Sequence, residues 1–492
     1  MSRWLIENTV SIQVLDKLEP YSTRTVVGEL TGLTQAPPTP RPLARCLGVL
    51  GILFLTLSAT TPASSVFIIV PGMLQSAGTG TLWAFLLAGL VCLGTAYVYA
   101  ELSSAFPIAG GEYVAVARTL GPLPGFVVLG INVFNNMIFP PVVGLGVSAV
   151  LGTVIPGLPQ IPTAIAVVVG STLCALLNIR VNALVTGLFL LVEVAALGVL
   201  VLLGLFHPAR AIMPLLTHPT MLTGGALVPA SHASIGLATT VAIFALNGYG
   251  MAVYFGEEMH DAPTRIGRVI LVSFVISLLL ELAPIVAVLA GAPDLKALFA
   301  ADDPFGLFVA GEGGTLLSQL VAIGVVIAIV NAAIVTVLAS ARFFWCTGRD
   351  AVWGYRFDEF IGAIHPKWQS PWVATLIIGL IGVVCCFISL KFLLILNGGG
   401  LIVTYAAISL GAIAGRRNGS SDHGPYRMPL FPLAPVFTLL ALAYVVYANW
   451  QDVDEGRPGM IATGAQIVLA AAYYWVLVKR RGAWVVRDPV PV

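Results

Sequence analysis

Apolar residues occur along this chain in long blocks that short polar segments separate. A membrane-spanning helix needs about 20 mostly apolar residues, because each residue advances a helix by only about 1.5 Å. The pattern therefore predicts an all-α membrane protein with about twelve transmembrane helices. The predicted spans cover residues 47–72, 82–105, 123–152, 161–179, 183–206, 235–256, 268–291, 314–346, 372–389, 392–414, 431–449 and 459–478.

Two of these spans, the first and the sixth, are interrupted in their middles by polar and small residues. The first contains SATTPASS (Ser58–Ser65), and the sixth contains FALNGYG (Phe244–Gly250). In a bilayer such a break is tolerated only where it faces protein or a watery cavity, because unpaired backbone groups are costly in hydrocarbon. Breaks at matching places in two halves of a chain indicate the binding site of a secondary transporter.

The positions of the breaks also predict an internal symmetry. Each half begins with a broken span and contains five spans. Because five is an odd number, the two halves have opposite orientations and form a five-plus-five inverted repeat with broken helices 1 and 6. Two extra helices follow. The expected parts are a cytoplasmic N-terminal tail (1–45), a first repeat (46–234), a second inverted repeat (235–415), spans 11 and 12 (416–480) and a cytoplasmic C-terminal tail (481–492).

Lysine and arginine residues fall mainly on one side of the predicted membrane. All but four of the 24 lysines and arginines lie on the side of the N-terminus. The four exceptions are Arg210, Lys296, Lys391 and Arg457. Because positive residues are retained in the cytoplasm, we expect a multi-pass protein of the plasma membrane with both termini cytoplasmic. The loops around 207–234 and 291–313 are then outside, and the loop around 347–371 is inside.

The amino-acid composition agrees with a membrane protein and excludes some kinds of binding partner. Hydrophobic residues make up 58% of the chain and charged residues only 10%, against about 25% charged residues in soluble domains. The net charge of +1 provides no field that would recruit nucleic acid. The six cysteines lie in or beside apolar segments without metal-ligand spacing, so neither a metal nor a cofactor is expected. The first 45 residues lack the short apolar core of a cleavable signal peptide.

The first break has the residues of a helix N-terminus. Pro62 suits the first position of a new helix, with Thr61 as its N-cap. The N–H groups of Ala63, Ser64 and Ser65 would then be free at a helix end that favours an anion, such as a substrate carboxylate. The alternative is a proline kink in which Ser and Thr hydroxyls bond back to the helix.

The second break combines backbone freedom with polar and aromatic side chains. Gly248 permits a non-helical backbone, Asn247 exposes an amide, and Phe244 and Tyr249 offer a wall for an apolar part of a ligand. These four residues are candidates for substrate binding. The alternative is close helix packing through small residues, against which Asn247 and Tyr249 argue because each needs a polar partner.

Four further segments complete a recognisable pattern. They are AELSSAFPIAGGEY (Ala100–Tyr113), YFGEEMHDAPTRIGRVI (Tyr254–Ile270), ASARFFWCTGRDAVW (Ala339–Trp353) and GPYRMPLFPLAP (Gly424–Pro435). In this order, and with the two breaks, they resemble the amino acid–polyamine–organocation (APC) superfamily of permeases over nearly the whole chain after residue 45. The resemblance implies a LeuT-type fold, alternating access, and transport of an amino acid or a related amine.

The resemblance also suggests where a substrate binds. A Gly-Ser-Gly-like triplet in the family's first span binds the substrate carboxylate, and it falls on Ala63–Ser65, where both glycines are replaced. Carboxylate binding through backbone amides stays open, but an amine without a carboxylate becomes more plausible. The family's sixth-span element of aromatic residues and glycine falls within Phe244–Tyr249.

Three polar residues inside the spans are further candidates. Glu193 lies midway along the fifth span, where many proton-coupled relatives carry a lysine, and a carboxylate at this depth is a functional candidate by default. It is interpreted as a proton-coupling group or a counter-ion for a cationic substrate, the alternative being a neutral structural Glu. Glu281, one turn before Pro284, is a weaker candidate. Asn331 either lines a pocket or bonds between helices, and no Ser/Thr pair precedes it, which disfavours sodium coupling.

Charged residues at the predicted cytoplasmic ends of spans either pair as an inner gate or only fix the topology. They are Glu101, Glu257, Glu258, Arg265, Arg342 and Arg349. The spans contain no paired catalytic groups, so an enzyme is not expected. The resulting prediction is a secondary active transporter of amino acids or related amines, proton-coupled, whose partners are the substrate, the lipid bilayer and protons. An amino acid/polyamine exchanger and a non-transporting sensor on the same fold are the alternatives.

Overall fold

The computed structural model describes residues 42–155, 157–482 and 484–489, and these are almost entirely helical. Nine helical stretches of the described chain are long and apolar enough to cross a membrane. The first, Val49–Ala105, contains two predicted spans, and the shorter apolar helices Gln160–Ala175 and Trp372–Cys385 occupy the fourth and ninth. Each predicted span therefore coincides with a helix, and the all-α membrane fold class is confirmed.

The spans consist of the following elements. They are α3 (Val49–Thr60), α4 (Pro62–Ser64), the π-helical turn η1 (Ser65–Ile69) and α5 (Val70–Ala77) in span 1; α6 (Thr81–Ala105); α8 (Pro122–Val154); α9 (Gln160–Ala175); α10 (Ile179–Phe206); α12 (His232–Ala245) with the 3₁₀ helix η3 (Tyr249–Glu258) in span 6; α13 (Ala262–Gly291); α16 (Thr315–Arg349); α18 (Trp372–Cys385); α19 (Leu390–Asn418); α20 (Leu433–Gln451); and α21 (Gly456–Tyr473) with η4 (Tyr474–Val478) and η5 (Lys479–Arg481) in span 12.

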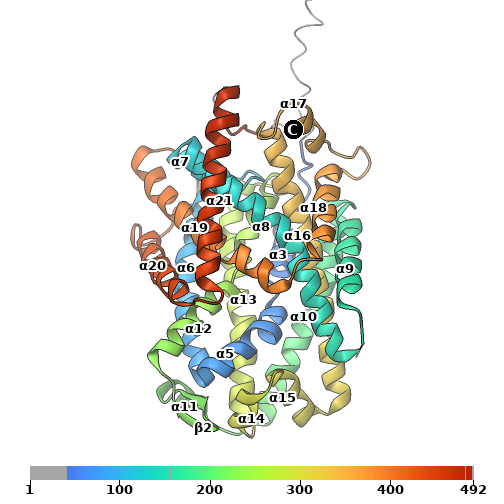
Figure 1. The fold of residues 1–492 in the computed structure, drawn as a ribbon, viewed down its shortest axis with the longest axis vertical. Helices are drawn as coiled ribbons and strands as arrows, with labels where there is room; N and C mark the ends of the chain where they lie inside the picture. The colour runs from blue at the N-terminus through green and yellow to red at the C-terminus, as the bar shows by residue number, and fades with distance from the viewer. Residues whose placement is uncertain (1–41, 156, 483, 490–492) are drawn as a thin grey trace, which may run out of the picture. The chain divides into compact units, whose positions relative to one another are not determined.

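Short elements connect the spans and gather at two opposite ends. They are η2 (Gly78–Gly80), α7 (Glu112–Leu120), α11 (Ile212–Thr217), the antiparallel strands β1 (Thr220–Thr223) and β2 (Ala226–Pro229), α14 (Leu295–Ala300), α15 (Pro304–Gly313) and α17 (Tyr355–Ile361). Figure 1 shows α11, β2, α14 and α15 at the lower end, here named the hairpin end, and α17 at the upper end, here named the α17 end. The loops that the sequence places on opposite sides of a membrane therefore lie at opposite ends.

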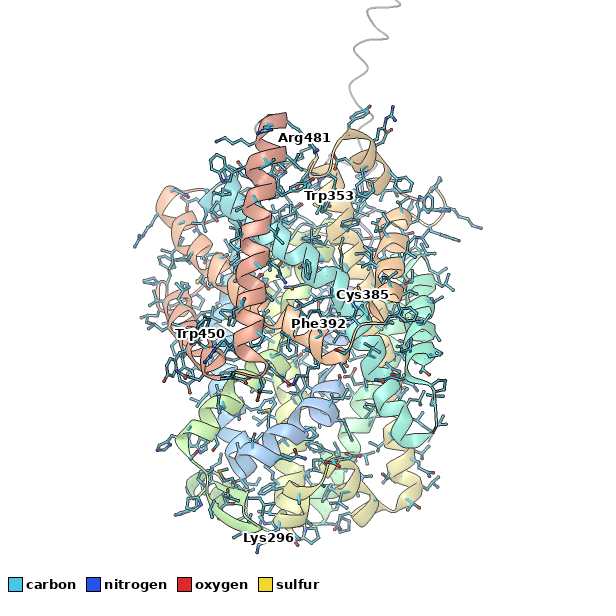
Figure 2. All side chains as sticks on the ribbon, viewed as in Figure 1. Lys296, Trp353, Cys385, Phe392, Trp450 and Arg481 are labelled. Atoms are coloured by element: carbon cyan, nitrogen blue, oxygen red, sulfur yellow. The ribbon has the colours of Figure 1, made fainter. Side chains whose placement is uncertain are left out.

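Two charged residues, Lys296 and Arg481, illustrate this division. Lys296, one of the four exceptions in the Lys and Arg distribution, lies at the hairpin end, whereas Arg481 lies at the α17 end (Figure 2). By the distribution of Lys and Arg, the α17 end is the one predicted to be cytoplasmic.

The helix α10 illustrates how the sequence sorts its residues between lipid and protein. Leu184, Leu188 and Leu191 follow one face of this helix, and each is at least 60% exposed. The opposite face buries Thr186 and Glu193 completely. An exposed apolar stripe of this kind is suited to contact with the hydrocarbon core of a bilayer. The polar residues of α10 therefore face the protein interior.

Candidate transport site

The first break is centred on Thr61, which ends α3 and precedes Pro62, the first residue of α4. Thr61 has a left-handed backbone (φ 44°), a conformation that costs a non-glycine residue roughly 1–2 kcal/mol. It occupies the N-cap position, as predicted, but its side chain makes no capping hydrogen bond. Its hydroxyl instead lies against the Glu193 carboxylate. Strain of this kind is typical of functional sites.

The chain's own carboxylate occupies the anion-favouring end of the new helical segment. The N–H of Ala63 donates to Glu193 Oε1 at 2.9 Å. The N–H of Ser65 donates to the Thr61 carbonyl at 3.2 Å. Glu193 is completely buried, and its second oxygen, Oε2, has no hydrogen bond of normal geometry among the described residues. The N–H of Ala63, which was predicted to bind a substrate carboxylate, therefore binds the carboxylate of Glu193 instead.

The second break packs directly on the first. After α12 ends at Ala245, Gly248 takes a φ of 129°, and a Cβ atom there would lie 2.6 Å from the Cα of Thr60. Only glycine allows this approach. The Ser65 hydroxyl donates to the Ala245 carbonyl at 3.0 Å, which satisfies one of the carbonyl groups left open where α12 ends. The two breaks thus form one continuous region.

The second break also lines a polar cavity of about 100 Å³, here named the asparagine cavity. It is lined by Tyr99, Glu112, Asn132, Asn135, Asn136, Phe139, Phe244, Asn247, Gly250, Met251, Tyr254, Thr336, Asn397, Leu401 and Thr404. These residues come from α6, α7, α8, α12, η3, α16 and α19 and from the break between α12 and η3. The described residues of the lining include a carboxylate, several amides and four aromatic rings, and none of them is Lys, Arg or His.

Glu112, at the start of α7, supplies the carboxylate of this cavity. Its Oε1 accepts a hydrogen bond from Tyr99 Oη at 2.8 Å, and its Oε2 accepts from Tyr254 Oη at 2.9 Å and Asn132 Nδ2 at 3.1 Å. Burial raises the pKa of Glu112 above its usual value, while these hydrogen bonds favour the ionised form. The donors are neutral, so an ionised Glu112 brings an uncompensated negative charge to the cavity.

Sequence reasoning missed most of this cavity. Asn132, Asn135 and Asn136 occur at spacings of i, i+3 and i+4 in an otherwise apolar span, which places them on one face of a helix. That spacing was the available signal. Glu112 lies in a motif that the sequence analysis quoted, but nothing local distinguishes it from other acidic residues near span ends.

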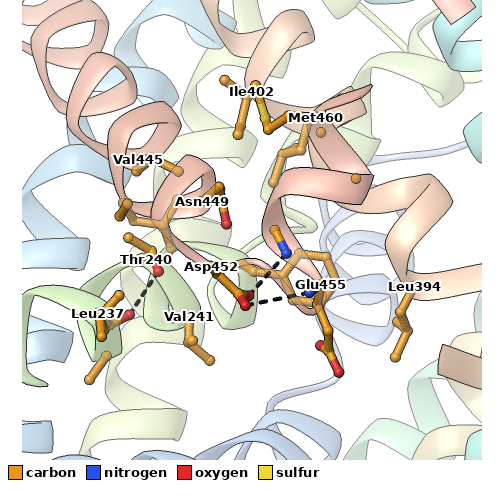
Figure 3. A pocket seen from close by; sticks show the side chains of 18 of the residues that line it. Leu237, Thr240, Val241, Leu394, Ile402, Val445, Asn449, Asp452, Glu455 and Met460 are labelled. Atoms are coloured by element: carbon orange, nitrogen blue, oxygen red, sulfur yellow. Dashed lines mark hydrogen bonds between the residues drawn. The ribbon is translucent and has the colours of Figure 1, made fainter. Parts of the chain in front are cut away.

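A larger cavity of about 530 Å³ lies beside the asparagine cavity, between α5, α12, α19, α20 and α21 (Figure 3). Phe244 and Leu401 line both cavities and so stand between them. Tyr405 lines the larger cavity and donates to Asn247 Oδ1 at 2.8 Å, which fixes an amide of the smaller one. Asp452 lies on the larger cavity's wall, where its Oδ2 accepts from the N–H of Gly456 at 3.0 Å.

Of the predicted substrate-binding residues, Phe244 and Asn247 line the asparagine cavity. Thr61, Ala63, Ser64, Ser65, Gly248 and Tyr249 line neither of these two cavities. Tyr249 is completely buried, with its ring edge-on to Tyr99 at 6.1 Å and to Phe274 at 5.4 Å between centroids. Tyr249 therefore supports the wall of the asparagine cavity from behind Tyr99.

Asn331 joins three helices rather than facing either cavity. Its Nδ2 donates to Ser58 Oγ at 2.8 Å and to the Thr186 carbonyl at 3.1 Å. These bonds hold α16 against α3 and α10 next to the first break. The interhelical hydrogen bonding that the sequence analysis gave as one alternative is therefore present.

Ion pairs with buried members lie toward the α17 end. Arg342 makes two hydrogen bonds to Glu258, and both side chains are 1% exposed. Arg349 pairs with Glu257 at 2.7 Å, and Glu101 pairs with Arg416 at 2.6 Å. Arg265 instead makes an exposed pair with Asp261, one turn away on the same helix. Most of the charges that were predicted at this end therefore do pair, and they connect η3 to α16 and α6 to α19.

Comparison with known proteins agrees with this architecture. Residues 47–477 match a family model described as amino acid permease. A branched-chain amino acid permease of Bacillus subtilis is 21% identical over 82% of this chain and 88% of its own length. A methylthioribose transporter of the same species is 22% identical over the same shares. The low-affinity putrescine importer of Escherichia coli is 24% identical over 76% of this chain and 80% of its own length.

Proposed function

Because the chain belongs to the amino acid permease family, we propose that it is a secondary active transporter that moves an amino acid or a related amine by alternating access. The observation that carries the proposal is the asparagine cavity, a polar space lined by the second break, which packs directly on the first break, in an otherwise apolar protein. Transporters bind their substrates at such breaks near the middle of the membrane. The names of the relatives, which cover an amino acid, a diamine and a thiosugar, favour a small polar metabolite.

Alternating access then depends on two barriers around this cavity. Phe244 and Leu401 separate it from the larger cavity. The buried pairs of Arg342 with Glu258 and of Arg349 with Glu257 close the α17 end. Transport requires that these barriers open in turn, by movement of the two halves 46–234 and 235–415 against each other. We place the protein in the plasma membrane with both termini cytoplasmic, as its Lys and Arg distribution predicts.

Proton coupling is assigned to Glu193. When ionised, its carboxylate holds the N–H of Ala63 through a charge-assisted bond of about 1.5–3 kcal/mol. A proton on Glu193 removes the negative charge from this helix end and weakens the bond. Segment α4 then becomes free to move relative to α10. Thr61, Ser64 and Ser65 move together with α4. Protonation is in this way connected to movement of the first break, which packs on the substrate cavity through Gly248.

The purified protein in proteoliposomes provides the test. Counterflow of labelled leucine, putrescine and methylthioribose would be measured with and without an inwardly directed proton gradient. We expect exchange of at least one compound, and its loss in Asn247→Ala and Asn136→Ala. Leu188→Ala, a change on the lipid-facing side of α10, is the matched control. Saturable binding without exchange of label would instead identify a sensor, and the transport function would be wrong.

A further inference from the structure

We infer that the substrate is an amine that lacks a carboxylate, and that Glu193 provides from within the protein the carboxylate that such an amine does not bring. This inference rests on the proposed transport function, because it specifies the ligand of the same site. It is carried by three observations: the occupied end of α4, the composition of the asparagine cavity, and the charges along the larger cavity.

The first observation is that the chain's own groups already use the backbone N–H groups of Ala63 and Ser65 at the first break. The N–H of Ala63 is used by Glu193, and that of Ser65 by the Thr61 carbonyl. Pro62 has no N–H to offer. A substrate carboxylate could bind the N–H of Ala63 only by displacing Glu193, which is completely buried and would lose its hydrogen-bonding partner. Bringing a second carboxylate next to the first would also place two like charges in a medium of low dielectric constant.

The second observation is the charge balance of the asparagine cavity. Glu112 accepts hydrogen bonds from three neutral donors, and the described residues of the lining include no Lys, Arg or His, so an ionised Glu112 has no counter-ion in the cavity. Its charged member is the carboxylate of Glu112. An ammonium group is the complementary ligand for such a cavity. The buried Oδ1 of Asn135 has no hydrogen bond among the described residues, so it can accept one from an N–H group.

The same lining can also hold the remainder of an amine. The rings of Tyr99, Tyr254, Phe139 and Phe244 belong to the wall. Aromatic rings bind both a methylene chain and the face-on approach of a cation. A short aliphatic mono- or diamine meets these requirements, because its ammonium group faces Glu112 and its chain faces the rings.

The third observation is independent of the first two. Asp452 and Glu455 line the larger cavity (Figure 3), and the described residues of its wall include no Lys, Arg or His. Glu455 pairs with Lys391 at 3.2 Å, so Asp452 is the acidic residue of this wall that makes no ion pair among the described residues. A carboxylate on the wall of a cavity attracts cations and repels anions. The carboxylate of Asp452 accepts the backbone N–H groups of Asp454 and Gly456. A cationic substrate is therefore favoured along the space that adjoins the asparagine cavity through Phe244.

Pairs of compounds that differ only by a carboxylate test the inference. The pairs are isoamylamine with leucine, putrescine with ornithine, and agmatine with arginine. Binding would be measured by displacement and thermal shift on the purified protein, and exchange by counterflow. We expect the amine of at least one pair to bind at least tenfold more tightly than its amino acid. Equal or tighter binding of the amino acid in every pair that binds, or no binding by any amine, would overturn the inference.

The role of Glu193 has its own test. Glu193→Ala leaves the N–H of Ala63 free, so we expect the preference for amine over amino acid to shrink at least tenfold. We also expect millimolar acetate to raise the thermal stability of this variant. Glu281→Ala, which removes another completely buried carboxylate, is the matched control and should show no response to acetate. An unchanged preference together with no acetate response in Glu193→Ala would overturn the assignment.

Different outcomes would contradict the transport function and the amine as substrate. Tight binding of an amine without counterflow would support the substrate class and contradict the transport function. Counterflow of leucine, ornithine or arginine in preference to the matching amine would support transport and contradict the substrate class.

Discussion

Glu193 and Ala63 are 130 positions apart in the chain, yet the carboxylate of one accepts the backbone N–H of the other at 2.9 Å. This contact couples α10 to the first break. We expect Glu193→Gln to keep the hydrogen bond, because an amide oxygen also accepts, but to lose the charge that a proton can neutralise. Uptake of the transported compound should then lose its stimulation by an inward proton gradient, while counterflow at equal pH persists. If the variant keeps the stimulation of the wild type, Glu193 is not the coupling group.

Gly248 is the position where the two breaks touch. Its φ of 129° and the 2.6 Å approach of a Cβ atom to Thr60 Cα mean that Gly248→Ala must move one of the two breaks. We expect a loss of about 1–3 kcal/mol of stability, together with a loss of transport. Thermal unfolding in detergent measures the first effect. Gly464→Ala is the control, because a Cβ there meets open space and alanine suits the interior of α21.

The pair of Arg342 and Glu258 differs in its surroundings from the pair of Arg265 and Asp261. Arg342→Gln leaves Glu258, which is 1% exposed, without its cation, and this should cost about 3–5 kcal/mol. Arg265→Gln breaks a pair whose members are 50% and 66% exposed, so a loss of only about 0.5 kcal/mol or less is expected. Thermal unfolding of both variants measures the two losses of stability. Equal effects would contradict a structural role for the buried pair.

The positions of the spans and of their breaks could be predicted because each depends on local sequence. Hydropathy blocks of sufficient length define the helices, and proline or glycine at mid-span defines the interruptions. Pro62 does begin a helical segment, and Gly248 does take a backbone conformation that other residues avoid. The N-cap position of Thr61 was predicted for the same reason.

The chemistry of the site could not be predicted to the same extent, because it depends on which helices pack together. No local pattern indicates that Glu193 meets Ala63, since that requires the rotation of α10 and its packing against α4. For the same reason, the sequence could not show that Glu112 accepts hydrogen bonds from Tyr99 and Tyr254, which belong to two different spans.

Glu112 makes amine binding depend on pH in a defined direction. Burial raises its pKa above the usual value of about 4.3, and the ionised form attracts an ammonium group. Tyr99, Tyr254 and Asn132 are its neighbours and carry no charge at neutral pH. Binding of an amine at equal pH on both sides should therefore rise as pH increases through the pKa of Glu112.

The matching variant is Glu112→Gln, which should bind the amine more weakly and lose this rise. Displacement of a labelled amine at a series of pH values measures both effects. A variant that keeps the rise would show that another group titrates.

Phe244 should control how fast a bound substrate leaves, because its ring stands between the asparagine cavity and the larger one. Phe244→Ala removes the ring and joins the two spaces, so we expect the dissociation rate of a labelled substrate to rise at least tenfold. Phe244→Tyr keeps the ring and should remain within about threefold of the wild type. Val241→Ala is the control, since Val241 lines the larger cavity but not the smaller one. An unchanged dissociation rate in Phe244→Ala would mean that the substrate leaves by a different route.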